Sequence, residues 1–280
     1  MSGDILARST AHWSEARRAG MDAFYRLATD DYRHLAEARD WATWLRGAEA
    51  RAPGSSLRLL DVACGSGKFP NALVAHADVA EAGLAPITTD LLDPSAFSIA
   101  EARAALPAPF VPAGEHETTL QGLDASVGPF DVVWATHALY AVPAADLPAA
   151  AARFLAAIAP GGRGVIAHSA ADGHYVAFHR LFLSEFGAPG DAAYISAEML
   201  ADALRAAGGA VTVTEVRYDS VAGPGDTDAV EGYLQRCVFD DTVPLADMQA
   251  APRIGRYLAD CRSDDGWRFP QVAHLIDIAA

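Results

Sequence analysis

The sequence is poor in cysteine, and this scarcity excludes two kinds of framework. Its 280 residues include three cysteines, Cys64, Cys237 and Cys261, which are odd in number and widely separated. They supply neither a disulfide framework nor the paired spacing of a metal site. We therefore expect a protein of a reducing compartment with no metal centre.

Positive charge and long apolar runs are also scarce. Lysine and arginine number 21 against 36 acidic residues, whereas binding to nucleic-acid phosphates requires an excess of basic residues. No run approaches the roughly 20 apolar residues of a membrane-spanning helix. The first residues, MSGDILARSTAHW, lack the order of a secretion signal. We expect a cytoplasmic protein with no nucleic-acid or membrane partner.

The most informative segment is LLDVACGSG at residues 59–67. A short apolar run ends at Asp61, and Gly65 and Gly67 follow two residues apart, before a segment at 68–80 that can form a helix. Because glycine lacks a Cβ atom, a ligand can approach the backbone closely at such a turn. The segment predicts the strand, glycine turn and helix of a nucleotide-binding α/β domain, with an ordinary tight connection as the alternative.

This turn differs from a diphosphate-binding loop. Such a loop has a third glycine three residues after the second, where this chain has Pro70. The acid at the turn, Asp61, suits a cationic or hydroxyl-bearing ligand better than a phosphate. S-adenosylmethionine has a sulfonium, an ammonium and ribose hydroxyls but no phosphate, so we expect it as the cofactor. Asp61 would contact its amino-acid part directly or through water.

The chain alternates strands and helices after an N-terminal helical region. Residues 1–52 are predicted to form a helical cap, and residues 53–280 a cofactor-binding domain with a helical insert at about 223–265. Strands are expected at 57–63, 87–92, 108–112, 130–136, 162–168, 211–221 and 269–278, and helices at 68–80, 95–105, 144–158 and 196–207. This pattern predicts an α/β, Rossmann-like fold with a mostly parallel seven-stranded sheet and an antiparallel last strand.

An acid is expected at the end of the second strand. Asp93 precedes a helix, and a carboxylate in that position can accept hydrogen bonds from both ribose hydroxyls. Asp90 is a rival three residues earlier, but the Asp-Pro-Ser sequence favours Asp93. Helix capping by Asp93 or Ser95 is an alternative that could hold at the same time.

The segment FDVVWATHALYAV places further polar groups at the end of a strand. Thr136 ends the predicted strand and His137 follows, at the edge where ligands bind in open α/β sheets. His137 could orient a nucleophile, take its proton or shape the pocket. Tyr140 could form an aromatic wall near a cation, or could belong to the core.

Two other polar or aromatic segments are less specific. In GEHETTLQ, at residues 114–121, Thr119 could meet the adenine edge of the cofactor, while a solvated loop is the alternative for its neighbours. The histidines of residues 168–182 lack the spacing of metal ligands. Phe178 in that segment could face a substrate pocket, with core packing as the alternative.

These motifs resemble class I S-adenosylmethionine-dependent methyltransferases, and within them histamine N-methyltransferase and its bacterial relatives. The closer resemblance includes THALYAVPAADL, YISAEMLADALRAAG and the closing FPQVAHLIDI. It implies that Ala63, Gly65 and Gly67 line the methionine moiety. It also implies that Asp93 holds the ribose with Ser98 nearby, and that Thr119 approaches the adenine.

The same resemblance implies an acceptor site. His137 stands where that family has a glutamine that touches the substrate, Tyr140 matches its tyrosine, and Gln271 stands where it has an asparagine near the amine. An acid of the N-terminal helices contacts the amine there, and Asp30 or Asp31 is the nearest candidate. Because His137 and Gln271 differ from the family pattern, we expect a small-molecule substrate other than histamine.

The sequence thus predicts a methyltransferase that moves a methyl group to a small molecule, with nitrogen as the expected acceptor atom and S-adenosylhomocysteine as product. An O-methyltransferase of a natural-product pathway, with His137 as base, is an alternative. A non-methylating cyclase or binding protein on the same scaffold is another. The missing third glycine disfavours a nicotinamide dehydrogenase. The oligomeric state stays open, with a homodimer among the alternatives.

Overall fold

A computed structural model describes residues 5–52 and 56–279, whose centre is one mixed β-sheet. Its strands follow the order β3-β2-β1-β4-β5-β8-β6, and the short β7 pairs with β8. The strands β1 to β5 are parallel, whereas β8 runs antiparallel between β5 and β6. Their bounds are β1 Arg58–Val62, β2 Ile87–Asp93, β3 Phe110–Glu117, β4 Phe130–Thr136, β5 Ile158–Ser169, β6 Ala210–Ala222, β7 Arg262–Ser263 and β8 Gly266–Ala279. The predicted Rossmann-like, mostly parallel sheet with an antiparallel last strand is confirmed, and the two-residue β7 adds an eighth strand to the seven predicted.

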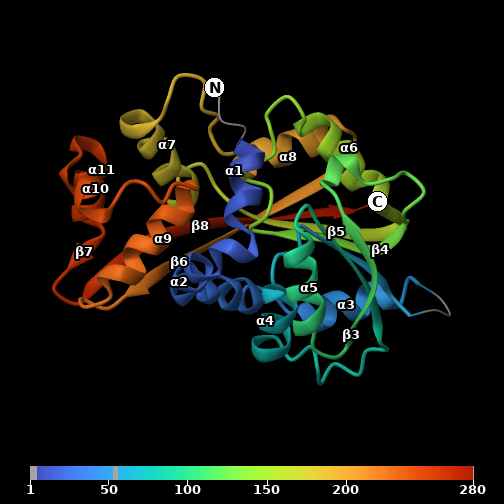
Figure 1. The fold of residues 1–280 in the computed structure, drawn as a ribbon. Coiled ribbons are helices and arrows are strands. Elements are labelled where there is room, and N and C mark those ends of the chain that lie inside the picture. The colour runs from blue at the N-terminus through green and yellow to red at the C-terminus, as the bar shows by residue number, and fades with distance from the viewer. Residues whose placement is uncertain (1–4, 53–55, 280) are drawn as a thin grey trace.

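Helices cover both faces of this sheet (Figure 1). One face packs on α6 (Leu147–Ala157) and α8 (Ala197–Ala206), and the other on α2 (Arg18–Glu37), α3 (Trp41–Glu49) and α4 (Lys68–His76). Successive side chains along a strand point to opposite faces of the sheet, and this alternation produces the two layers. Leu60 and Val133 face one layer, whereas Leu59 and Val132 face the other.

A third apolar cluster joins the N-terminal helices to the late part of the chain. It is formed by α2, α7 (His174–Phe186), α9 (Thr227–Val238), α10 (Leu245–Ala250), α11 (Pro252–Asp260) and the start of β8. The helix α2 contacts α9, α4 and β6. The division into a cap of residues 1–52 and a domain of residues 53–280 stays a prediction. The packing nevertheless brings the N-terminal helices and the insert together.

Two predicted segments differ from the structure. The strand predicted at 108–112 extends from Phe110 to Glu117 and includes part of the segment interpreted as a polar loop. It is an edge strand whose side chains are alternately exposed and half-buried, so its polar residues resemble a loop. The helix α7 was not predicted, because it is buried on several sides and has no clear polar face.

Four further elements complete the described chain, and one of them is the one-turn helix η1 (Glu15–Arg17), which directly precedes α2. The helix α1 (Ile5–His12) precedes α2, and α5 (Ala96–Ala105) follows β2. The one-turn helix η2 (Leu120–Gly122) follows β3. No helix among the described residues is long and apolar enough to cross a membrane.

Candidate functional site

The turn between β1 and α4 has an unusual backbone. Ala63, Gly65 and Gly67 have φ values of +50°, +52° and +70°, in the left-handed region that costs residues with a Cβ atom free energy. Cys64 N donates to the carbonyl of Leu92 at 3.0 Å, which ties the turn to β2. The chain therefore bends sharply at the carboxyl ends of two neighbouring parallel strands, where ligands of such sheets bind.

A cavity lies at this edge of the sheet and extends under the N-terminal helices. Most of the residues proposed from the sequence line it. They are Asp31, Asp61, Ala63, Gly65, Asp93, Ser98, Thr119, Thr136, His137 and Tyr140. The carboxyl ends of β1, β2 and β4 thus contribute to one site, as the parallel topology requires.

Gly67 is not among the residues that line the cavity, and its contact with the methionine moiety stays a prediction. It caps α4, and a Cβ atom added to it would lie 3.2 Å from the Cα atom of Ala102 in α5. The absence of a side chain at Gly67 therefore allows two helices to approach each other.

Asp93 ends β2 and faces the turn. Its Oδ2 accepts a hydrogen bond from Gly65 N at 3.1 Å, and its Oδ1 accepts one from Ser95 N at 2.9 Å. Burial raises its pKa to about 6. The rival Asp90 instead contacts His116 Nε2 at 2.9 Å and does not line the cavity. The structure therefore favours Asp93 over Asp90.

Asp61 is also buried at the turn, where burial raises its pKa to about 8, with a smaller contribution from the charge of Asp93. Two neighbouring carboxyls whose ionisation is disfavoured provide a suitable environment for a cationic ligand, since a positive charge would stabilise their ionised forms. Carboxylates can also accept hydrogen bonds from hydroxyl groups. These two carboxyls fit the ammonium, sulfonium and ribose of S-adenosylmethionine better than they fit a phosphate.

His137 is held between two tyrosines. Its Nδ1 lies 2.7 Å from the hydroxyl of Tyr140, and its Nε2 lies 3.4 Å from that of Tyr218 in β6. Burial lowers its pKa to about 3, so the imidazole is neutral near pH 7. A neutral imidazole with both nitrogens near hydroxyl groups can orient its neighbours, but it is a weak base.

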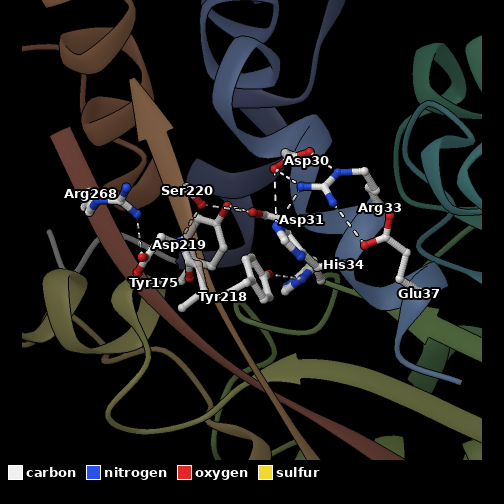
Figure 2. Close-up of polar contacts among 12 residues, drawn as sticks. Asp30, Asp31, Arg33, His34, Glu37, Tyr175, Tyr218, Asp219, Ser220 and Arg268 are labelled. Carbon is white, nitrogen blue, oxygen red and sulfur yellow. Dashed lines mark hydrogen bonds and ion pairs between the residues drawn. The ribbon is translucent and has the colours of Figure 1, made fainter. Parts of the chain in front are cut away.

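The two acids proposed in the N-terminal helices have different surroundings (Figure 2). Asp30 is partly exposed and forms a bidentate ion pair with Arg33 at 2.6 and 2.7 Å. Asp31 is 1% exposed, lines the cavity, and accepts hydrogen bonds from Tyr175 Oη and, at 3.0 Å, from Ser220 Oγ. Burial raises the pKa of Asp31 to about 7. Of the two, Asp31 is the better-placed candidate for substrate binding, whereas Asp30 does not line the cavity and its role stays a prediction.

Aromatic rings surround this end of the cavity. The Tyr140 and Tyr175 ring centroids are 5.9 Å apart, and those of His137 and Tyr175 are 5.7 Å apart. Other aromatic residues that line the cavity are Trp13, Phe24, Tyr25, Tyr32, Phe69, Tyr194 and Phe239. A carboxylate among the faces and edges of aromatic rings is a suitable setting for an organic cation.

Two proposed substrate residues lie outside the cavity lining. Phe178 is fully buried and stacks on His174 with ring centroids 5.3 Å apart, so the core alternative is the better interpretation. Gln271 is buried in β8, where its Nε2 donates to Ser220 Oγ and to the hydroxyl of Tyr233. A direct contact of either side chain with a substrate stays a prediction, which the lining of the cavity does not favour.

Sequence reasoning missed three residues of the site. Tyr175 belongs to the aromatic segment that was noticed, but without α7 its direction could not be inferred. Ser220 lies within a strand and has no local signal. Arg236 of α9 lines the cavity and donates to the backbone carbonyls of His12 and Arg17, which joins the insert to the N-terminal segment.

A sequence model of a family described as a methyltransferase domain matches residues 30–213. The chain belongs to this methyltransferase family. S-adenosylmethionine is the cofactor of the methyltransferase, with S-adenosylhomocysteine as its product. The match covers the glycine turn, Asp93 and His137, which are therefore parts of a methyltransferase domain.

Solved structures share the fold of the methyltransferase. The magnesium protoporphyrin IX methyltransferase of Synechocystis PCC 6803, with bound S-adenosylhomocysteine, has a TM-score of 0.54 at 13% identity, over 99% of this chain and 100% of that one. A structure titled a putative methyltransferase of Bacillus halodurans C-125 has a TM-score of 0.52 at 13% identity, over 84% of this chain and 97% of that one. At this identity the likeness establishes the fold alone.

No curated protein matches the chain significantly. The comparisons do not support the closer resemblance to histamine N-methyltransferase. Among the described residues, no group of three or more His, Cys, Asp or Glu side chains could hold a metal ion.

Proposed function

We propose that this methyltransferase transfers the methyl group of S-adenosylmethionine to the nitrogen of a small amine. The observation that carries the proposal is Asp31, a buried carboxylate at the aromatic end of the cavity. An ionised carboxylate in such surroundings favours a cationic partner, because a neutral ligand would leave its charge uncompensated.

The cofactor end of the cavity has its own proposed roles. Asp93 would accept hydrogen bonds from the ribose hydroxyls, with Ser98 nearby, and Asp61 would interact with the amino-acid part beside Ala63 and Gly65. Thr119 would approach the adenine, and Thr136 would line the cavity at the end of β4. When bound, the cofactor supplies a methyl group that its sulfonium already activates.

The residues of the acceptor end have three tasks. Asp31 pairs with the ammonium form of the substrate and, with a pKa of about 7, can take the proton that this nitrogen must lose before it attacks. The rings of Tyr140 and Tyr175 exclude water and restrict the orientation of the amine. His137 holds the hydroxyl of Tyr140 in place.

The low pKa of His137 bears on the O-methyltransferase alternative. A hydroxyl acceptor requires a general base whose pKa is near the working pH, whereas burial lowers that of His137 to about 3. An amine needs no such base on the strand edge once Asp31 has taken its proton. The low pKa of His137 therefore counts against the form of the O-methyltransferase alternative in which His137 is the base, and the preference for nitrogen rests on the charge of Asp31 beside the aromatic rings.

The test compares amines with matched alcohols. Purified protein with S-adenosylmethionine is supplied with a panel of small amines and their hydroxyl analogues, and mass spectrometry measures methylated product and S-adenosylhomocysteine. We expect methylated amines, and a loss in kcat/KM of at least about 30-fold in Asp31→Asn, since removing one partner of a buried ion pair costs several kcal/mol.

The neighbouring variant Asp30→Asn provides the matched control, because Asp30 is ion-paired on the outer side of the same helix. It should keep nearly the wild-type kcat/KM. Preference for the alcohols, or equal losses in Asp30→Asn and Asp31→Asn, would contradict the proposal.

A further inference from the structure

A chain of buried hydrogen bonds lies behind Asp31, and Figure 2 labels its first two members, Asp31 and Ser220. Ser220 Oγ in β6 donates to Asp31 Oδ1 at 3.0 Å, and Gln271 Nε2 in β8 donates to Ser220 Oγ at 3.0 Å. The same amide nitrogen donates to the hydroxyl of Tyr233 in α9 at 2.9 Å. Ser220 and Gln271 are 0% and 2% exposed, so water does not replace these partners readily.

The direction of this chain follows from the chemistry of its groups. The amide nitrogen of Gln271 can only donate, so it uses an acceptor lone pair of Ser220. Ser220 has a single hydroxyl hydrogen, which is then free to point at Asp31. An ionised carboxylate can only accept, and it therefore ends the chain with the correct polarity. If the amide were turned over, its oxygen would draw the hydrogen of Ser220 away from Asp31.

The groups that face Asp31 provide no competing cation. Within residues 5–52 and 56–279, Asp31 forms no ion pair with Lys, Arg or His, and the charge of Asp30 on its own helix opposes its ionisation. The other titratable groups around it come from α2, α7, β6, α9 and the segment after β4, and burial raises the pKa of each, so they stay neutral near pH 7. They are Tyr32, Tyr175, Tyr218, Tyr233, Cys237 and Tyr140.

The ionised form of Asp31 thus depends on hydroxyl donors. Tyr175 supplies one directly, and Tyr218 also stabilises the ionised form. Ser220 supplies a further one, and Gln271 fixes its direction by occupying a lone pair of the hydroxyl. We propose that Gln271 is a positioning residue that, through Ser220, keeps a hydrogen aimed at Asp31 and so maintains the oriented carboxylate that selects a cationic amine. The selection of an amine rests on the proposed function, whereas the effect on Asp31 does not.

The first test measures Asp31 without a methyl acceptor. In protein labelled with ¹³C at the aspartate carboxyls and saturated with S-adenosylhomocysteine, Asp31→Asn identifies the resonance of Asp31. We expect Gln271→Leu to raise the pKa of Asp31 by about one unit, because a hydrogen bond to the charged form is weakened. Ser220→Ala should raise it at least as far, and Ser220→Thr, which keeps a hydroxyl, should restore it.

Gln235→Leu is the matched control, since the amide of Gln235 donates to backbone carbonyls near Val243 and not toward Asp31. It should leave the titration of Asp31 unchanged. If Ser220→Ala does not fold, Gln271→Leu and Ser220→Thr decide the result. A pKa of Asp31 that is the same in Gln271→Leu and wild type would overturn the positioning role.

The second test uses the amine that the wild-type enzyme methylates best. In Gln271→Leu the acidic limb of kcat/KM against pH should move to higher pH by the same shift that the carboxyl resonance shows, while binding of S-adenosylhomocysteine stays unchanged. A shifted resonance in a protein that methylates no amine would retain the hydrogen-bond chain but overturn the amine selection. The two tests therefore distinguish failure of the positioning role of Gln271 from failure of the proposed amine methylation.

Discussion

At the scale of residues, three carboxyls that line the cavity differ in the donors that hold them. Asp93 accepts hydrogen bonds from two backbone amides, and its pKa is about 6. Asp31 accepts hydrogen bonds from two hydroxyl groups and has a pKa of about 7. For Asp61 the side chain of Trp134 alone favours the charged form, and its pKa reaches about 8. Burial raises all three values, and hydrogen bonds to the charged form offset part of the increase.

Asp93 provides the prediction at this scale. Asp93→Asn keeps the size of the side chain, but its amide hydrogens would face the N–H groups of Gly65 or Ser95, and one acceptor oxygen is lost. We expect the Kd for S-adenosylhomocysteine to rise at least about 10-fold, measured by titration calorimetry. Asp90→Asn is the control, because Asp90 is outside the cavity. Unchanged affinity in Asp93→Asn would remove this residue from the cofactor site.

At the scale of elements, the junction of β1 and α4 depends on close packing as well as on backbone shape. Gly67 has a φ value of +70° and lies against Ala102 of α5. Gly83 has nearly the same φ value, +68°, but a Cβ atom there would meet nothing within 4 Å. The two glycines therefore separate the cost of backbone strain from the cost of a steric contact.

Alanine substitutions at these positions test the difference. Gly83→Ala should lower the free energy of unfolding by about 1 kcal/mol through left-handed strain alone. Gly67→Ala should cost about 2 kcal/mol or more, because the new Cβ atom also pushes against the backbone of α5. Urea denaturation measures both values. Equal costs would show that the approach of α4 and α5 does not depend on Gly67.

At the scale of the whole molecule, buried histidines and buried aspartates impose opposite pH dependences. Burial lowers the pKa of four histidines to about 3 or 4. They are His137, His168, His174 and His179. Below the usual histidine pKa of 6.5, these histidines are protonated in the unfolded chain but stay neutral in the folded one. The free energy of unfolding therefore falls as pH falls. Asp31, Asp61 and Asp93 have raised pKa values, so the folded chain holds their protons longer, and stability falls as pH rises through them.

The two effects predict maximum stability at about pH 6.5 for the ligand-free protein. Asp31 is one of the carboxyls whose ionisation lowers the free energy of unfolding as pH rises. In Asp31→Asn the loss between about pH 6.5 and 8.5 should therefore be smaller by about 1 kcal/mol. Urea denaturation over this range in wild type and variant measures the change. A wild-type stability that keeps rising above pH 7 would contradict the assignment of these buried carboxyls.

The features that the sequence determined are those that consecutive residues carry. The apolar strand, Asp61 and the glycines specify a sharp turn within nine residues, LLDVACGSG, and Asp93 and His137 follow strands whose topology places their ends at one edge. Residue types and spacing were sufficient there, because strand alternation and glycine conformation are local properties. The sheet and the cofactor edge could therefore be predicted before the structure was known.

The acceptor site was decided by tertiary packing. Tyr175 and Ser220 lie 144 and 189 residues from Asp31 along the chain, and Gln271 lies 51 residues beyond Ser220. Only the packing of α2 against β6 and α9 buries Asp31, turns Asp30 to the surface and moves Gln271 behind Ser220. Burial sets the pKa of a carboxyl and the hydrogen bonds it must form, and burial is a property of the assembled molecule.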